Sequence, residues 1–407
     1  MSTFAYRSKS NRSTWRYLKT DDESEMLSNA LIQISFDGSR FTGWSAANDG
    51  GSDEIQSNDK LQKPSKRRRR RGAVGEIPQK AGFVRSVEGI IRDNLAKIYG
   101  NVNPNRIVVE GCSRTDRGVH SQGMIAQIYC LKDTVLDDMK SNGYDEKASS
   151  IPGKRKPHPI SSTDMTYFEP IPMEGNLSRL AFALNRMRPA DVQITGIAPT
   201  PATESSQSDL PFHPSLNTKS KTYEYRISIG KFQDPTLRRT AWYISALNEL
   251  NIEKIKTGCK MLIGTHDFAA FQGAPRGAEE KKKRVEQQSE SSKRSTICTL
   301  FDVQCIMDEP PTKEIYYPGL DLCTYKIVIT GDRFLYKMNR FIVGALVALG
   351  SGNLDLDDIE MALRIGSWKV PEQEDSRKEF TCAPAHGLTL KEVNYGDLSI
   401  DWQPLRY

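Results

Sequence analysis

The residues best suited to chemistry lie in one short stretch, Gly111 to His120, which holds a carboxylate among arginines. Asp116 has Arg114 two positions before it and Arg117 directly after it. Nearby guanidinium groups favour the ionised form of a carboxyl group, and an ionised carboxylate can act as a nucleophile. The same pattern is also typical of an ordinary solvated Asp-Gly-type turn, so the residue types alone leave both interpretations open.

A strand and a helix are predicted to position this stretch. Residues 106–110 form a short, β-branched and apolar run with turn-forming residues after it, which predicts that Asp116 lies in a loop at the end of a strand. Upstream, Ser86 is a plausible helix N-cap, and apolar residues follow it at helical spacing as far as Gly100. We expect this helix to pack on the strand that leads to Asp116.

The run Arg114-Thr115-Asp116, followed by Gly118-Val119-His120, resembles the catalytic motif of the TruA family of tRNA pseudouridine synthases. Further stretches stand in the order of that family's motifs: Phe36–Trp44, Lys221–Tyr225, Gly264–Phe268, Phe334–Arg340 and Ala383–Leu388. Because these matches are ordered and cover most of the chain, the resemblance is specific.

The resemblance implies an α+β fold, with two α/β domains whose mostly antiparallel sheets are covered by helices and meet at an RNA-binding cleft. It implies an isomerase that converts uridine to pseudouridine in tRNA, in the anticodon stem-loop, without cofactor or metal. Asp116 would be the nucleophile, Arg340 its charge partner across the cleft, Tyr223 a residue of the base pocket, and Arg114 a contact to the target nucleotide. The resemblance implies that the protein binds tRNA and does not bind a membrane. It leaves open whether the protein forms a homodimer.

Both Tyr223 and Arg340 also have simpler interpretations. Tyr223 alternates with Tyr225 and Ile227, which is typical of the buried face of a strand. Arg340 lies off the apolar helical stripe that we expect between Phe334 and Leu349, and such an arginine usually faces water. By the resemblance Tyr223 would stack on the extruded uracil, and a buried Arg340–Asp116 pair would have a functional reason for its desolvation cost.

The sequence departs from the family's usual pattern in ways that bear on substrate choice. Ser113 stands where glycine is common, Arg117 where a small residue or lysine is usual, and Ser45-Ala46-Ala47 replaces a glutamine-rich stretch. The alternative function is a non-catalytic RNA-binding or tRNA-folding protein on the same scaffold. An aspartate-based hydrolase would need a second acid at a fixed distance or a metal cluster, and neither has a sequence signal.

Composition narrows the class of protein. The 407 residues contain no apolar run long enough to span a bilayer. The 7 cysteines form no C-x-x-C pair and the 5 histidines show no ligand spacing, so neither a disulfide framework nor a metal site is predicted. The net charge of +6 equals that of the single run Lys66–Arg71, so a nucleic-acid site in the rest of the chain requires local clustering of charge.

We expect two domains interrupted by polar insertions. The expected segments are a disordered N-terminus (1–29), a catalytic domain (30–197) with insertions at about 47–81 and 132–169, a linker (198–211), a C-terminal domain (212–397) with an insertion at about 278–294, and a tail (398–407). Residues 1–20 resemble a transit peptide as much as a disordered tail. The basic run 66–71 fits a nuclear import signal, an RNA-binding arm or a solvated loop, so we expect the nucleus or cytoplasm and leave an organelle open.

The remaining patterns predict strands that alternate between polar and apolar residues, mixed with amphipathic helices. We expect strands at 31–36, 124–131, 192–194, 223–229 and 325–330, and helices through Leu177–Met187 and Ile252–Leu262. Alternating strands favour antiparallel sheets with helices on one face.

Overall fold

The computed structural model describes residues 27–45, 86–133, 168–201, 211–245, 250–273, 295–308, 322–368 and 380–405. The basic run 66–71, residues 1–20 and nearly all of the three expected insertions lie outside these ranges, and so does most of the expected linker. Our predictions for those segments therefore stay predictions.

One mixed sheet of 11 strands runs through the described residues in the order β5-β1-β3-β11-β6-β10-β9-β8, with β2 and β4 on β3 and β7 on β6. The strands are β1 (Asn29–Phe36), β2 (Ile107–Gly111), β3 (His120–Leu131), β4 (Phe168–Glu169), β5 (Val192–Pro199), β6 (Ser220–Gly230), β7 (Trp242–Ser245), β8 (Gly264–Asp267), β9 (Ile297–Asp308), β10 (Cys323–Gly331) and β11 (Leu388–Asn394). All pairs are antiparallel except β3–β11 and β6–β7. This confirms the predicted α+β class. The sheet continues across the boundary expected at 198–211.

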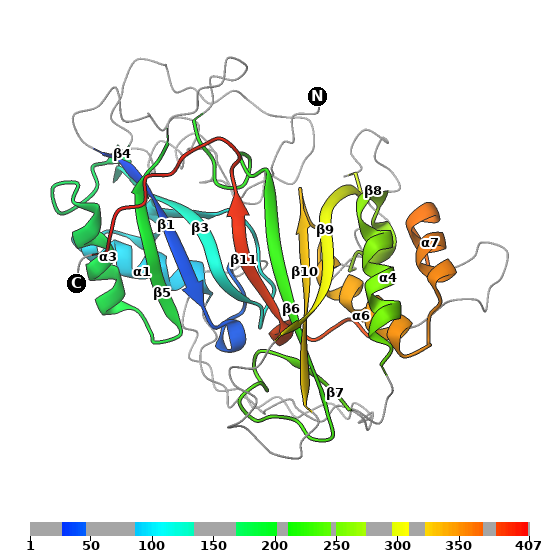
Figure 1. Cartoon of the computed structure of the whole chain (residues 1–407). Coiled ribbons are helices and arrows are strands. Elements are labelled where there is room, and N and C mark those ends of the chain that lie inside the picture. The colour runs from blue at the N-terminus through cyan, green and yellow to red at the C-terminus, as the bar shows by residue number, and fades with distance from the viewer. Residues whose placement is uncertain are drawn as a thin grey trace, which may run out of the picture.

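Helices gather at the two ends of the sheet (Figure 1). They are α1 (Val87–Ile98), α3 (Leu177–Met187), α4 (Ile252–Leu262), α6 (Met338–Gly350) and α7 (Leu356–Ile365). α1 packs on β2 and α3 on β5, whereas α4 packs on β9 and α6. Short 3₁₀ turns lie at η3 (Gly38–Arg40), η4 (Pro104–Arg106), η6 (Ala269–Phe271) and η8 (Ala385–Gly387). No helix among the described residues is both long and apolar enough to cross a membrane.

Apolar faces at helical spacing explain why these helices form where they do. α1 buries Val87, Ile90, Ile91 and Leu95, which face β2, so the predicted packing of this helix on the strand before Asp116 is confirmed. Burying each such side chain stabilises the fold by about 1.5–3 kcal/mol. α6 is buried almost all round, which makes it the core helix of the second half of the chain.

Two details of the predicted helices are wrong. Phe334 was expected on the α6 stripe, but the helix begins only at Met338 because Lys337 adopts a left-handed backbone with φ 60°. Met187 continues the apolar helical spacing of Leu177, Leu180 and Leu184, which predicts that it is buried with them, but it is 38% exposed because it is the last residue of a helix that stops before Pro189.

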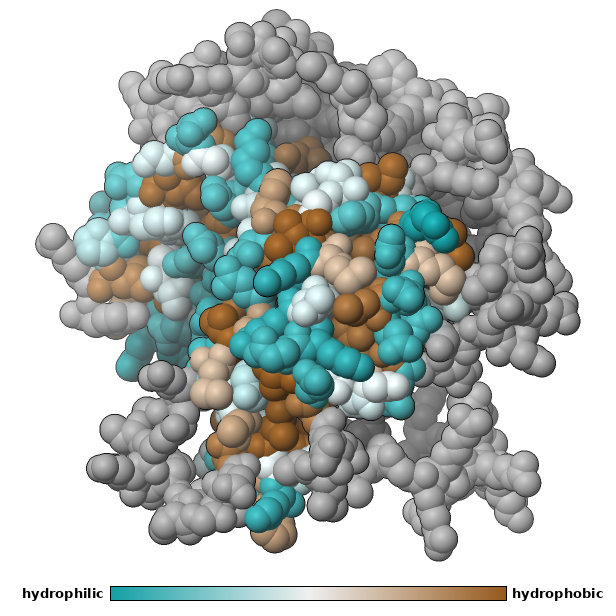
Figure 2. All heavy atoms as spheres, turned by 45° about the vertical axis from the view of Figure 1, so that its right-hand side comes forward, coloured by the Kyte–Doolittle hydropathy of each residue, from teal (hydrophilic) through white to brown (hydrophobic). Residues whose placement is uncertain are grey.

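The C-terminal segment lies across the N-terminal part of the sheet. Figure 1 shows it passing from β11 over β1 and β5, and Gln403 forms a bridge to Ile197 of β5. Residues 398–405, expected as a tail, thus pack on the sheet, with Trp402 over Gly196. On the side brought forward in Figure 2, hydrophilic and hydrophobic side chains are interspersed.

Ser86 provides a test of how the helix beside β2 begins. Its hydroxyl accepts a hydrogen bond from the backbone N–H of Gly89 at 3.1 Å, as predicted for an N-cap. We expect Ser86→Ala to lower the free energy of unfolding by about 1 kcal/mol, and Ser86→Asp to retain most of it, because a carboxylate can cap as well. Urea unfolding of the three proteins measures both effects; equal stability of all three would show that the cap contributes nothing.

Candidate active site

The loop that carries Asp116 leaves the sheet where β3 changes neighbours. β2 pairs with residues 126–130 of β3, whereas β11 pairs with His120 and Ser121 at its start. Between these two pairings the chain from Cys112 to Val119 leaves the plane of the sheet. Asp116 therefore lies at a split between strands, where side chains from both halves of the chain can reach it.

The first motif serves as backbone support for this loop. The backbone N–H of Trp44 donates to the carbonyl oxygen of Thr115 at 3.3 Å. A Cβ on Gly43, whose φ is +116°, would lie 2.4 Å from the same oxygen, and a Cβ on Gly38 would lie 1.9 Å from the carbonyl oxygen of Val119. Glycine is needed at both positions because no larger residue leaves room for the Asp116 loop.

Asp116 and Arg340 form an ion pair, with 3.4 Å between Oδ2 and Nη1. Arg340 lies in the first turn of α6, and its Nε donates to the carbonyl oxygen of Ala383 at 2.7 Å. The backbone N–H of Ala383 in turn donates to the carbonyl oxygen of Arg340 at 3.1 Å. The side chains of Asp116 and Arg340 are 23% and 14% exposed, so the pair is partly shielded from water while still open to a ligand.

Tyr223 lies next to this pair on the buried face of β6. Its hydroxyl is 2.9 Å from Oγ of Ser113, and its ring packs edge-to-face on Phe334 with 5.0 Å between centroids. Burial raises the pKa of Tyr223, and the charge of Asp116 raises it further, so the phenol is neutral at physiological pH. The Ser113 that replaces a common glycine thus orients the tyrosine, a contact that sequence reasoning missed.

The two loop arginines, Arg114 and Arg117, are both exposed, and Arg340 forms an ion pair with the Asp116 carboxylate. That Arg114 and Arg117 also favour the ionised form of Asp116 stays a prediction. The predicted contact of Arg114 with the target nucleotide likewise stays a prediction. Within the described ranges, no three His, Cys, Asp or Glu side chains gather as metal ligands.

Two histidines of the motifs, His120 and His386, connect segments around the site through contacts with main-chain carbonyl oxygens. The sequence did not predict these contacts. Nε2 of His120 lies 2.8 Å from the carbonyl oxygen of Arg239 and 3.0 Å from that of His386, and Nε2 of His386 lies 3.0 Å from that of Ala241. On its other side, Nδ1 of His120 is 3.1 Å from a carboxylate oxygen of Asp37. These contacts join the residue between β1 and η3, the start of β3, η8 and the chain before β7.

Known proteins with similar sequences are named tRNA pseudouridine synthases. The family model described as tRNA pseudouridine synthase matches residues 259–396, which include Arg340 and the last motif. The chain is 26% identical over 305 residues to tRNA pseudouridine synthase A of Acetivibrio thermocellus, covering 75% of this chain and 89% of that protein. It is 28% identical to the enzyme of that name from a Thermoanaerobacter species, with the same shares covered, and 24% identical over 370 residues to tRNA pseudouridine synthase A 2 of Bacillus cereus, covering 91% of this chain and 100% of that protein.

The chain is thus similar to the TruA family of tRNA pseudouridine synthases over most of its length. The TruA family motifs accordingly have distinct places in this site: one supplies Asp116, two supply Tyr223 and Arg340, and the first and last hold these side chains through the backbone. Gly264–Phe268, by contrast, lies at β8 at the far edge of the sheet.

The Asp37 carboxylate provides a pH test of the contacts made by His120. Its hydrogen bond with His120, together with those from Ser39, holds the pKa of Asp37 well below its usual range. A lowered folded-state pKa supplies stability above the unfolded-state pKa of about 3.9, and this stability is lost as pH falls below that value. We expect Asp37→Asn to be less stable than wild type at pH 7, and the gap to shrink below about pH 4.

Urea unfolding across this pH range measures the gap. Asp401→Asn is the control, because Asp401 is an exposed carboxylate near the C-terminus. A gap for Asp37→Asn that stays constant down to low pH would contradict the interaction with His120.

Proposed function

We propose that this protein converts uridine to pseudouridine in tRNA, with Asp116 as the nucleophile. The observation that carries the proposal is the Asp116–Arg340 ion pair, held at the split in the sheet beside Tyr223. The chain's similarity to this family supports the reaction class. Two hydrogen bonds between Arg340 and Ala383 support the proposed roles of Asp116 and Arg340. They hold the guanidinium group in place independently of the substrate.

The reaction breaks the bond between C1′ and N1 of the uridine, turns the uracil, and forms a bond between C1′ and C5. The proton on C5 leaves and N1 gains one, so the overall change is an isomerisation. Asp116 would attack the ribose or the base in the first step. Arg340 would keep the carboxylate ionised before the attack and balance its charge while the uracil is detached.

Tyr223 would form one wall of the base pocket. Its phenol is neutral and its hydroxyl is held by Ser113, so it can offer a ring face or a hydrogen bond to the uracil without carrying charge. The target uridine must leave its stack to reach Asp116, at a cost of a few kcal/mol that is lowest where the base is least well stacked and paired. For this reason we propose uridines in the anticodon stem-loop as targets.

The nucleophile is tested with tRNA that carries tritium at C5 of uridine, because isomerisation releases this hydrogen whereas binding does not. We expect Asp116→Asn to abolish tritium release while tRNA affinity stays within a few fold, since the amide keeps the shape of the side chain but is no nucleophile. Asp357→Asn, at an exposed position of α7, is the control and should be fully active. Activity of Asp116→Asn within about tenfold of wild type would refute the assignment.

The ion pair is tested by a double-mutant cycle. We expect Arg340→Ala to lower kcat by at least about tenfold, because the cation acts through the Asp116 carboxylate. In the Asp116→Asn background, the same change should have no further effect on residual turnover. If the losses of the two single variants instead add up, Arg340 acts independently of Asp116.

A further inference from the structure

Lys221 shares the active-site face of β6 with Tyr223. The two are separated by one residue, so their side chains lie on the same side of the sheet, about 7 Å apart along the strand. Lys221 pairs with Gly331 of β10 and with Val393 of β11. Gly331 has no side chain of its own, and the side chains next to it are those of Leu300 and of Phe334, the ring that packs on Tyr223. Lys221 therefore continues the wall of the site beyond the tyrosine.

The ammonium group of Lys221 lacks an ion pair with any residue in the described part of the chain. The acidic groups that act on it are the buried thiol of Cys112 and the carboxylate of Asp332, whose Oδ1 already accepts hydrogen bonds from the backbone N–H groups of Thr299 at 2.9 Å and Arg333 at 2.7 Å. Burial also lowers the pKa of Lys221, which means that the protein disfavours its charge. A largely buried cation that has no ion pair among the described residues carries a desolvation cost in the free protein.

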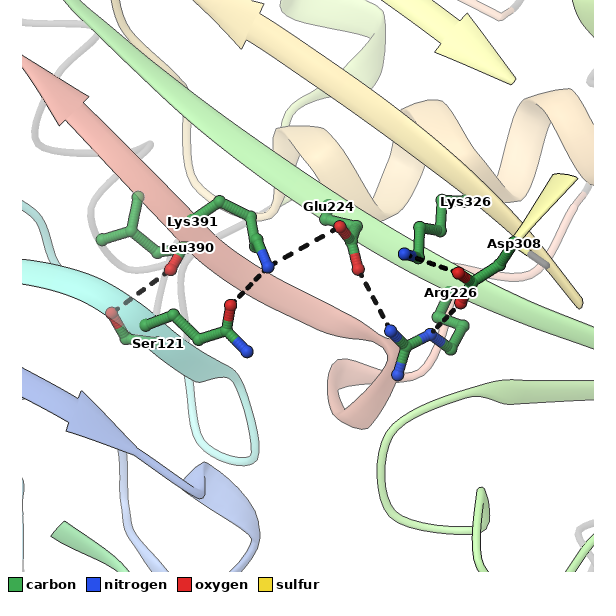
Figure 3. Close-up of polar contacts among 8 residues, drawn as sticks. Ser121, Glu224, Arg226, Asp308, Lys326, Leu390 and Lys391 are labelled. Atoms are coloured by element: carbon green, nitrogen blue, oxygen red, sulfur yellow. Dashed lines mark hydrogen bonds and ion pairs between the residues drawn. The ribbon is translucent and has the colours of Figure 1, made fainter. Parts of the chain in front are cut away.

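On the opposite face of β6, by contrast, the basic side chains form ion pairs with carboxylates (Figure 3). Asp308 pairs with Lys326 at 2.6 Å and with Arg226 at 3.0 Å, and Glu224 lies 3.4 Å from Arg226 and 3.8 Å from Lys391. There each of these basic side chains lies within 4 Å of a carboxylate, on its own strand or on another strand of the sheet. The contrast places the unpaired lysine of this strand on the face that holds Tyr223.

We infer that Lys221 binds a backbone phosphate of the RNA next to the target uridine. The inference rests on the proposed function, because a tRNA strand is the polyanion that would enter this site. A phosphate supplies the counter-ion that the described residues do not, and Lys is suited to it as a compact point charge with three donors. The spacing of about 7 Å from Tyr223 along the strand leaves room for one base in the pocket while its strand continues past Lys221.

The test compares tRNA binding by wild type and Lys221→Met, with unmodified tRNA transcript as the probe and KCl as the variable. Methionine keeps the length of the side chain and removes the charge. We expect Kd at low salt to rise about tenfold, and the slope of log affinity against log salt to fall by about 0.7–0.9, which corresponds to one phosphate contact. Lys221→Arg should retain the wild-type slope. Lys254→Met removes an exposed lysine of α4 and should change neither quantity.

Thermal unfolding separates binding from a structural role. If Lys221 serves to bind RNA and does not stabilise the fold, Lys221→Met should unfold at the same temperature as wild type or at a higher one, because the substitution removes a disfavoured charge. The inference would be overturned if folded Lys221→Met showed the same slope of log affinity against log salt as wild type. It would also be overturned if folded Lys221→Arg showed the reduced slope expected for Lys221→Met. These results do not depend on turnover: absence of tritium release by wild type would refute the proposed reaction and leave the binding comparison valid.

Discussion

The structure depends on β3 having two different neighbours along one edge. β2 pairs with its far end and β11 with its start, and the chain that joins β2 to β3 has to leave the sheet between them. At its start the loop still bonds to β3, because the backbone N–H of Cys112 donates to the carbonyl oxygen of Ile125 at 2.8 Å. The residues that follow are held by other elements. Trp44 and the close approach of Gly38 and Gly43 do this from the β1 side. The result is a carboxylate held firmly at a place that a large ligand can still reach.

Around this loop, the charged and polar side chains are positioned mainly by hydrogen bonds to main-chain atoms and less by contacts with one another. Arg340 reaches Asp116 because Ala383 holds both its side chain and its main chain. The two histidines likewise bind carbonyl oxygens of Arg239, Ala241 and His386. Carbonyl acceptors do not move as charged side chains do. The geometry of the ion pair is therefore set before any substrate arrives, which is what electrostatic stabilisation of a reaction requires.

Local patterns predicted the elements well because their causes are local. Ser86 and the apolar spacing after it define α1, and alternation at Tyr223 and Tyr225 defines the buried face of β6. The start of α6 was placed too early because the left-handed backbone of Lys337 leaves no trace in hydropathy. The pairing of Asp116 with Arg340 was expected only through the family resemblance.

Contacts to the main chain escaped prediction for a different reason. A carbonyl oxygen is the same at every residue, so nothing in the sequence marks Arg239 or Ala241 as a partner of histidine. The parallel pairing of β11 with β3 joins residues more than 260 positions apart, as the Ser121–Leu390 hydrogen bond illustrates. The role of Ser113 as partner of Tyr223 could have been suspected only from its departure from glycine.

The position of β11 has a consequence for the order in which the protein can mature on the ribosome. Everything up to α7 can be synthesised, including the nucleophile, the tyrosine and the arginine, while Ala383 and β11 are still missing. Until those residues emerge, the start of β3 is paired with β1 but has an open edge where β11 will lie, and Arg340 lacks its carbonyl anchor. The nascent chain thus carries its reactive groups without their final alignment, and one late segment closes the sheet and aligns the site in the same step.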